Sequence, residues 1–168
     1  MRKRRLITVF VLFILTACDF DVPLVGEASL PIDQALLGTW EAIPEDRDEQ
    51  KTPERIVISQ ESAKLYVIEH IDGESIIYFK GWLAELEGSH FMQVEVTGDN
   101  DKGPVGAEDD NLFSVVSYAL DNGKLVVRSL NTDLVDAELA DTVALQAAFA
   151  ANRDNPSLFH EPGRFRKL

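Results

Sequence analysis

Cysteine is almost absent from this sequence, since Cys18 is the only one in 168 residues. No disulfide can form within the chain, and no cluster of thiolates can hold a metal ion. Histidine is also scarce, and His70, His90 and His160 are too widely spaced to form a close ligand pair such as His-x-x-x-His. A zinc site would need carboxylates assembled by the fold, so the sequence predicts no metal and no cofactor.

Basic residues are few beyond the first five positions. Residues 2–5 are all Lys or Arg, and without them Lys plus Arg falls from 16 to 12 against 29 Asp plus Glu, so the net charge falls from −13 to −17. So negative a surface repels nucleic-acid phosphates and anionic lipid headgroups. Nucleic acid is therefore excluded as a partner, and we expect the domain to stand off the bilayer.

An apolar run near the N-terminus is too short to span a membrane. Residues 6–15 (LITVFVLFIL) are apolar except for Thr8, whereas a spanning helix needs roughly 20 apolar residues. Basic residues followed by a short apolar run are typical of a signal peptide. The run leads into Leu15-Thr16-Ala17-Cys18, which resembles the lipobox of bacterial lipoprotein signal peptides.

This resemblance implies a bacterial lipoprotein precursor that is cut between Ala17 and Cys18, with residues 1–17 as its signal peptide. Cys18 would then carry a diacylglyceryl thioether and an N-acyl chain, and two or three acyl chains hold a protein durably in a membrane. The implied location is the cell envelope, facing the periplasm. Asp19 resembles the inner-membrane retention signal of enterobacterial lipoproteins, which favours the inner over the outer membrane. The alternatives are a secretory signal with an incidental cysteine, an uncleaved anchor, and an Asp19 that simply belongs to an acidic tether.

The chain then divides into a tether and one domain. Residues 18–35 are interpreted as the lipidated cysteine and a flexible tether, because Pro23, Gly26 and Pro31 interrupt any periodicity. Residues 36–168 remain for a single β-rich domain.

The domain has the pattern of short strands joined by tight turns. Asp72-Gly73 and Asn122-Gly123 suit the positive φ angles of type I′ hairpin turns. Gly81, inside an expected strand, suggests a bulge or a bend. The expected strands cover residues 38–43, 55–60, 64–71, 74–86, 90–96, 112–121, 124–130 and 163–168.

Near the C-terminus the period of the apolar residues changes. Asp141-Thr142 is a favourable helix start, and Leu145, Ala148 and Phe149 share one face of a helix running to about residue 152. The sequence therefore predicts a mainly β fold. We expect an antiparallel meander of about seven or eight strands, forming a small barrel-like sheet with one short C-terminal helix.

Gly38-Thr39-Trp40, at the start of the first expected strand, resembles the Gly-x-Trp of lipocalin-type barrels. In that family an arginine near the last strand stacks over the tryptophan and helps to close the barrel. The resemblance assigns that contact to Arg164 or Arg166, and it implies that the barrel can hold a small apolar ligand. The alternative is a tryptophan that is merely buried at a strand start.

Other candidate sites have plainer interpretations. The loop 98–111 has five carboxylates, but Gly103 and Pro104 stand where a calcium loop needs Asp or Asn and then Gly, so we interpret it as a solvated acidic loop. Aromatic residues concentrate on two neighbouring expected strands, where they form either core or an exposed binding patch. They are Tyr66, Tyr78, Phe79 and Trp82.

Three functional hypotheses remain. The first is a non-enzymatic envelope lipoprotein whose domain binds a protein partner or supports an assembly. The second is a barrel that holds a small apolar ligand, and the third is a hydrolase with carboxylates assembled by the fold. A packed interior with an exposed aromatic patch favours the first, an apolar cavity open at one end the second, and a cleft holding two carboxylates the third.

Overall fold

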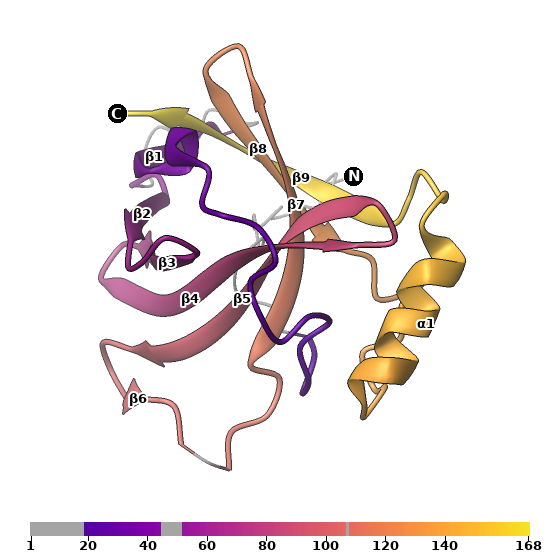
Figure 1. Cartoon of the computed structure of the whole chain (residues 1–168). Coiled ribbons are helices and arrows are strands. Elements are labelled where there is room, and N and C mark those ends of the chain that lie inside the picture. The colour runs from indigo at the N-terminus through magenta and orange to yellow at the C-terminus, as the bar shows by residue number, and fades with distance from the viewer. Residues whose placement is uncertain (1–18, 45–51, 107) are drawn as a thin grey trace, which may run out of the picture.

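A computed structural model describes residues 19–44, 52–106 and 108–168. In chain order its elements are η1 (Gln34–Leu36), β1 (Gly38–Ala42), β2 (Arg55–Gln60), β3 (Leu65–Asp72), β4 (Ser75–Leu86), β5 (Ser89–Asp99), β6 (Gly103–Pro104), β7 (Phe113–Asp121), β8 (Lys124–Leu130), α1 (Thr142–Asn152) and β9 (Phe159–Lys167) (Figure 1).

Eight of these strands close into an antiparallel barrel. Neighbours in the barrel follow one another along the chain from β1 to β5, β5 pairs with β7, and β9 returns to pair with β1. The two-residue strand β6 lies beside β5 only. The predicted mainly β meander with one short helix is therefore confirmed, and the sheet closes fully.

The two hairpin turns predicted from glycine differ in register. At Asn122-Gly123 both central residues have positive φ, 50° and 76°, as a type I′ turn requires. In the other hairpin Asp72 pairs with Ser75, so the central residues are Gly73 and Glu74, and of these only Gly73 has a positive φ, 61°. That is the pattern of a type II′ turn, one residue later than predicted.

Gly81 is not at a bulge. It pairs regularly with Tyr66 and Val94, and the register shift between β4 and β5 falls earlier, between Tyr78 and Phe79. Gly81 faces the barrel interior, where an added Cβ would lie 2.9 Å from Ile68 Cδ1. The missing side chain at this position therefore makes room for inward-pointing neighbours.

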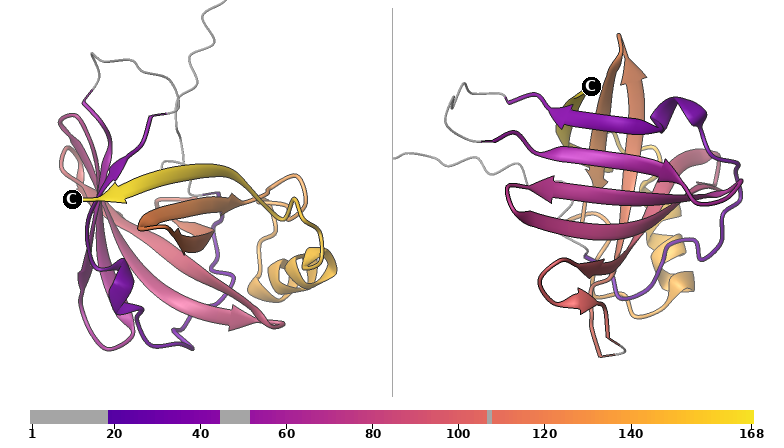
Figure 2. Two further views of the ribbon diagram at one scale, coloured as in Figure 1. Left: turned by 90° about the horizontal axis from the view of Figure 1, so that it is seen from above. Right: turned by 90° about the vertical axis from the view of Figure 1, so that its left-hand side faces the viewer.

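The helix prediction is confirmed. The Asp141 side chain accepts a hydrogen bond from Ala144 N at 2.8 Å, as an N-cap does, and Leu145 and Phe149 are buried. Figure 2 (left) shows α1 beside the barrel, outside its wall.

Two hydrophobic cores result, one on each side of the barrel wall. The interior core contains inward-pointing residues from all eight barrel strands together with Leu36 of η1. The second core lies between the outer face of β4, β5 and β7 and the segments that cover it, because neighbouring residues of these strands point to opposite faces. Its buried members are Phe20, Leu24, Trp82, Ala84, Phe91, Val115, Leu130, Val135, Leu145, Phe149 and Leu158.

The residues expected to form a flexible tether are packed against the barrel. Phe20 and Leu24 are 1% and 0% exposed, and burying two such side chains stabilises the fold by roughly 3–6 kcal/mol. Further along, Leu30 N and Ile32 N donate hydrogen bonds to Leu83 O and Ala63 O. The tether interpretation of 18–35 is therefore wrong for residues 19–33, since apolar burial and backbone bonding outweigh the prolines and glycine. Residue 18 lies outside the described residues.

Candidate functional site

The closure of the barrel brings Trp40 to the C-terminal strand, as the lipocalin resemblance implied, but a different cation lies over its ring. Trp40 pairs with Lys167, whose Nζ is 5.2 Å from the ring centroid. Side chains alternate along β9, so Phe165 and Lys167 point inward with Trp40, whereas Arg164 and Arg166 point outward. The assignment of the contact to Arg164 or Arg166 was therefore wrong, because both arginines point to the outer face of β9 and the next residue, Lys167, points inward.

Arg166 takes part in closure from the outer face instead. Its Nη2 donates to Glu41 Oε1, while Arg55 Nη2 donates to Glu41 Oε2 at 3.1 Å. These bonds join β9, β1 and β2 across the seam of the barrel. The hydrogen bond from Arg166, and then that from Arg55, lowers the pKa of the Glu41 carboxyl below its usual range.

The barrel interior is filled. Its cavity has a volume of about 30 Å³ and is lined entirely by apolar side chains and Tyr118. A void of roughly 10–15 Å³ takes one water, and a dry cavity of about 150 Å³ takes benzene, so this one is too small even for benzene. The lining residues are Leu36, Ile56, Ile58, Ile68, Met92, Val94, Val116, Tyr118, Leu125 and Val127.

One mouth of the barrel is closed by the chain that leads into β1. Leu36 enters the interior core, and its carbonyl accepts a hydrogen bond from Trp40 Nε1 at 2.8 Å. Asp33 N donates to Tyr66 Oη at 2.6 Å. Burial raises the pKa of Tyr66 to about 12 and also raises the pKa of Tyr118. This end of the barrel is therefore plugged by side chains.

A larger hollow lies on the outside. We call it the outer groove; its volume is about 600 Å³ and it is open to solvent. Trp82 and Leu65 supply apolar surface, and Trp82 Nε1 donates to Val25 O at 2.9 Å, which holds the N-terminal segment along one side of the groove. The lining residues are 26–28, 62–65, Lys80, Trp82 and Glu95, so Lys64 and Lys80 are balanced by Glu27 and Glu95.

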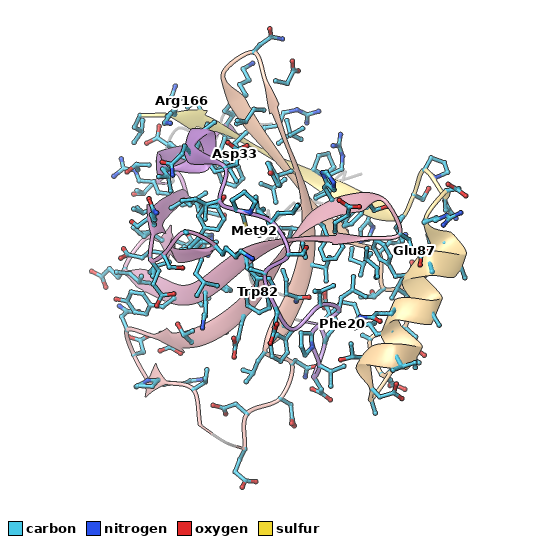
Figure 3. All side chains as sticks on the ribbon, viewed as in Figure 1. Phe20, Asp33, Trp82, Glu87, Met92 and Arg166 are labelled. Carbon is cyan, nitrogen blue, oxygen red and sulfur yellow. The ribbon has the colours of Figure 1, made fainter. Side chains whose placement is uncertain are left out.

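Gln93 fixes the N-terminal segment to the barrel. This side chain is 0% exposed, on the outer face of β5. Its Oε1 accepts from Leu24 N at 2.9 Å and from Val25 N at 3.3 Å, and its Nε2 donates to Ser114 O at 2.9 Å. Figure 3 labels Phe20 and Trp82, which pack in the second core beside it. The alternation of residues 90–96 places Gln93 and Glu95 on the face opposite Met92, Val94 and Val96, but it gives no signal that Gln93 is buried under another segment.

The predicted lipid-attachment and cleavage residues, Cys18 and Ala17, lie outside the described residues. Asp19 is described and half-buried, and its backbone N donates to Phe113 O at 3.1 Å. Burial, and then the nearby charge of Glu161, raises the pKa of Asp19.

The aromatic residues on β3 and β4 contribute to the cores. Tyr66 and Phe79 are buried in the interior and Trp82 in the second core, while Tyr78 is half-buried. The core alternative weighed for these residues therefore holds for three of them.

The histidines do not lie close together, and in the acidic loop the Asp99 carboxylate is bonded to backbone amides of the same loop. His70 Nε2 lies 3.3 Å from Glu54 Oε2, and His90 Nε2 lies 2.8 Å from Glu85 Oε2. Asp99 Oδ1 accepts from Lys102 N at 2.6 Å and from Asp101 N at 2.8 Å, and these bonds lower the Asp99 pKa. Within residues 19–44, 52–106 and 108–168, no three His, Cys, Asp or Glu residues are grouped so as to hold a metal ion.

Comparison with known proteins gave no match to a family model, to a curated protein or to a solved structure. In the part of the chain that the structure describes, no helix is long and apolar enough to cross a membrane.

Proposed function

We propose that this chain is an envelope lipoprotein, anchored through lipid on Cys18, whose barrel is a non-enzymatic binding module for a protein partner. The contact surface in this proposal is the outer groove. The observation that carries it is the contrast between an interior cavity of about 30 Å³ and an outer groove of about 600 Å³. Ligand sites usually measure roughly 300–1,000 Å³, so of these two hollows in the described residues the outer groove is the one that is large enough.

The chemistry of the outer groove suits a protein segment. Its apolar surface, supplied mainly by the half-buried Leu65 beside the buried ring of Trp82, lies next to two ammonium and two carboxylate groups. A buried apolar centre with a polar rim is the usual composition of a protein–protein contact. Since the charges of this groove balance, a partner can bind there despite the net charge of −17 that remains without residues 2–5.

The anchor is tested by replacing Cys18. In cells fed radioactive palmitate, the parent should take up label and fractionate with membranes, and Cys18→Ser should do neither. Thr16→Ser is the matched control, because the lipobox pattern leaves that position open, and it should behave as the parent does. Label on Cys18→Ser, or equal membrane retention of this variant, would contradict the lipid anchor. Asp19 leads us to propose the inner membrane, which sucrose-gradient separation of the two membranes checks.

The outer groove is tested by site-specific photo-crosslinking in intact cells. A photoreactive amino acid at Ala63, in the groove, should give a discrete adduct with one envelope protein. The same amino acid at Ala119, which is exposed on β7 and does not line the groove, is the control and should give none. Equal adducts from both positions would remove the groove from the proposal.

A second candidate, a small apolar ligand inside the barrel, is supported by the apolar lining of the cavity. It requires Leu36 to leave the interior, because the cavity is otherwise too small. Nile red fluorescence distinguishes the two candidates. Binding of the dye inside the barrel of the unmodified sequence, with displacement by fatty acid, would favour the apolar-ligand candidate.

A further inference from the structure

The first described residues of the chain are joined to the barrel by backbone bonds. Asp19 N and Phe20 N each donate to Phe113 O at 3.1 Å, and Phe113 N donates back to Phe20 O at 3.0 Å. Asp21 Oδ1 accepts from Asn111 N at 2.8 Å. The chain is therefore attached to the start of β7 from residue 19, the first residue that the structure describes.

Bonds further along the same segment make this attachment extensive. Thr142 Oγ1 donates to Pro23 O at 3.0 Å, and Gln146 Nε2 donates to Leu24 O at 2.9 Å. With the bonds to Gln93, the segment is held by β5, β7 and α1 together. Because several elements hold it at once, separating it from the barrel requires losing all of these contacts.

Covalent geometry places the proposed anchor next to this attachment, because Cys18 is bonded directly to Asp19. Consecutive Cα atoms are about 3.8 Å apart, so a lipid on Cys18 is bonded one residue from the barrel wall. We propose that the lipidated protein rests directly on the bilayer in one orientation, with the anchor-proximal face, formed by Asp19, Asn111, Phe113 and Glu161, on the headgroups. This inference rests on the proposed lipidation of Cys18, and it replaces the expectation that the domain stands off the membrane.

The contact is imposed by the anchor and not by attraction. Glu161 is close enough to Asp19 for its charge to raise the pKa of Asp19, whereas the charge of His160 acts in the opposite direction, and Asp21 is a third carboxylate. An anionic leaflet repels such a face. The protein without lipid should consequently not bind vesicles at all, of either zwitterionic or anionic composition.

Strand β7 leads from the anchor-proximal face to the opposite end of the molecule. This strand runs from Phe113, at the anchor-proximal face, to Asp121, which is roughly 26 Å at about 3.3 Å per residue. Lys124 pairs with Asp121 at the tip of the β7–β8 hairpin, which projects at the top of Figure 1, while the loop before β7 lies at the bottom. A label near residue 110 and one at residue 124 therefore report on opposite ends.

The test is energy transfer from the protein to a headgroup-labelled lipid. Cys18 is the only native cysteine and its sulfur is blocked by lipid, so Asp110→Cys or Lys124→Cys supplies a single free thiol for the donor dye. The full lipidated protein is reconstituted into phosphatidylcholine vesicles that carry the acceptor lipid. We expect transfer from position 110 to exceed that from position 124 several-fold.

A linker variant is the matched control. Fifteen Gly and Ser residues inserted between Cys18 and Asp19 have an r.m.s. reach of roughly 20 Å and should reduce the transfer from position 110 toward that from 124. Equal transfer from both positions in the protein without the linker would overturn the orientation while leaving the lipid anchor intact. A purified N-terminus with a free thiol, by mass spectrometry, would overturn both.

Discussion

The attachment of the N-terminal segment depends on one buried amide side chain, and replacing it tests whether residues 19–25 belong to the fold. Gln93→Leu keeps nearly the same volume but removes the acceptor for Leu24 N and Val25 N and the donor to Ser114 O. The bond to Leu24 N is buried, and leaving a buried N–H without a partner costs about 1–3 kcal/mol. Water can replace the half-buried bond to Val25 N, and the Ser114 carbonyl has a second lone pair for its strand partner.

We therefore expect the free energy of unfolding to fall by about 1–3 kcal/mol, which corresponds to a decrease in Tm of roughly 3–10 °C for a chain of this size. Urea unfolding of the mature chain carrying Cys18→Ser, with and without Gln93→Leu, measures the difference. Hydrogen exchange adds a local measurement, because the amides of Leu24 and Val25 should lose protection more than those of β1.

Gln60→Leu is the control for this prediction. Gln60 is exposed on β2 and donates only to Ser62 O, two residues away, so its replacement should change the unfolding free energy by less than about 0.5 kcal/mol. If Gln93→Leu also fell within that range, with unchanged protection at Leu24, the amide would not be what holds the segment, and the reasoning would be refuted.

Three further predictions concern the barrel. Leu36→Ala should enlarge the interior cavity and lower the free energy of unfolding by about 2–5 kcal/mol, measured with urea. Benzene should then raise the Tm of this variant only. Leu168, exposed at the C-terminus, supplies the control, because Leu168→Ala should leave the unfolding free energy unchanged. Because the folded pKa of Glu41 is lowered, the advantage in Tm of the parent over Glu41→Gln should be complete above about pH 5 and vanish as the pH falls through that pKa. Tyr66, with a pKa raised to about 12 from an ordinary value of about 10, should make the fold lose stability as the pH rises from about 10 to 12, and Tyr66→Phe should lessen that loss; an unchanged slope would contradict its burial.

Local patterns predicted the strands and turns of the barrel well, because a short stretch of sequence determines each of them. The alternation in β5 and β7 and the pair Asn122-Gly123 each specify their structure without help from distant residues. Closure was also predictable in outline, from Trp40 near the start and basic residues near the end. The identity of the cation was not, because the parity of β9 depends on its pairing with β1, which places Lys167 inside.

The packing of the N-terminal segment was missed because it depends on a surface that no local pattern describes. Phe20, Val22 and Leu24 do alternate with polar residues or proline, and that spacing was the available signal of an extended, half-buried segment. The second core that receives it combines β4, β5, β7 and α1. The role of Gln93 was not predictable for the same reason, since Leu24, whose amide it binds, is 69 residues away in sequence.

Pairing β1 with β9 has a consequence for any binding partner. In an open sheet, an edge strand offers free amide and carbonyl groups to which another chain can add a strand. Here the eight barrel strands use both sides of their backbone on one another, and the short strand β6 is the exception. Recognition by main-chain pairing is thus closed off along the barrel wall, and a partner must distinguish this protein by its side chains.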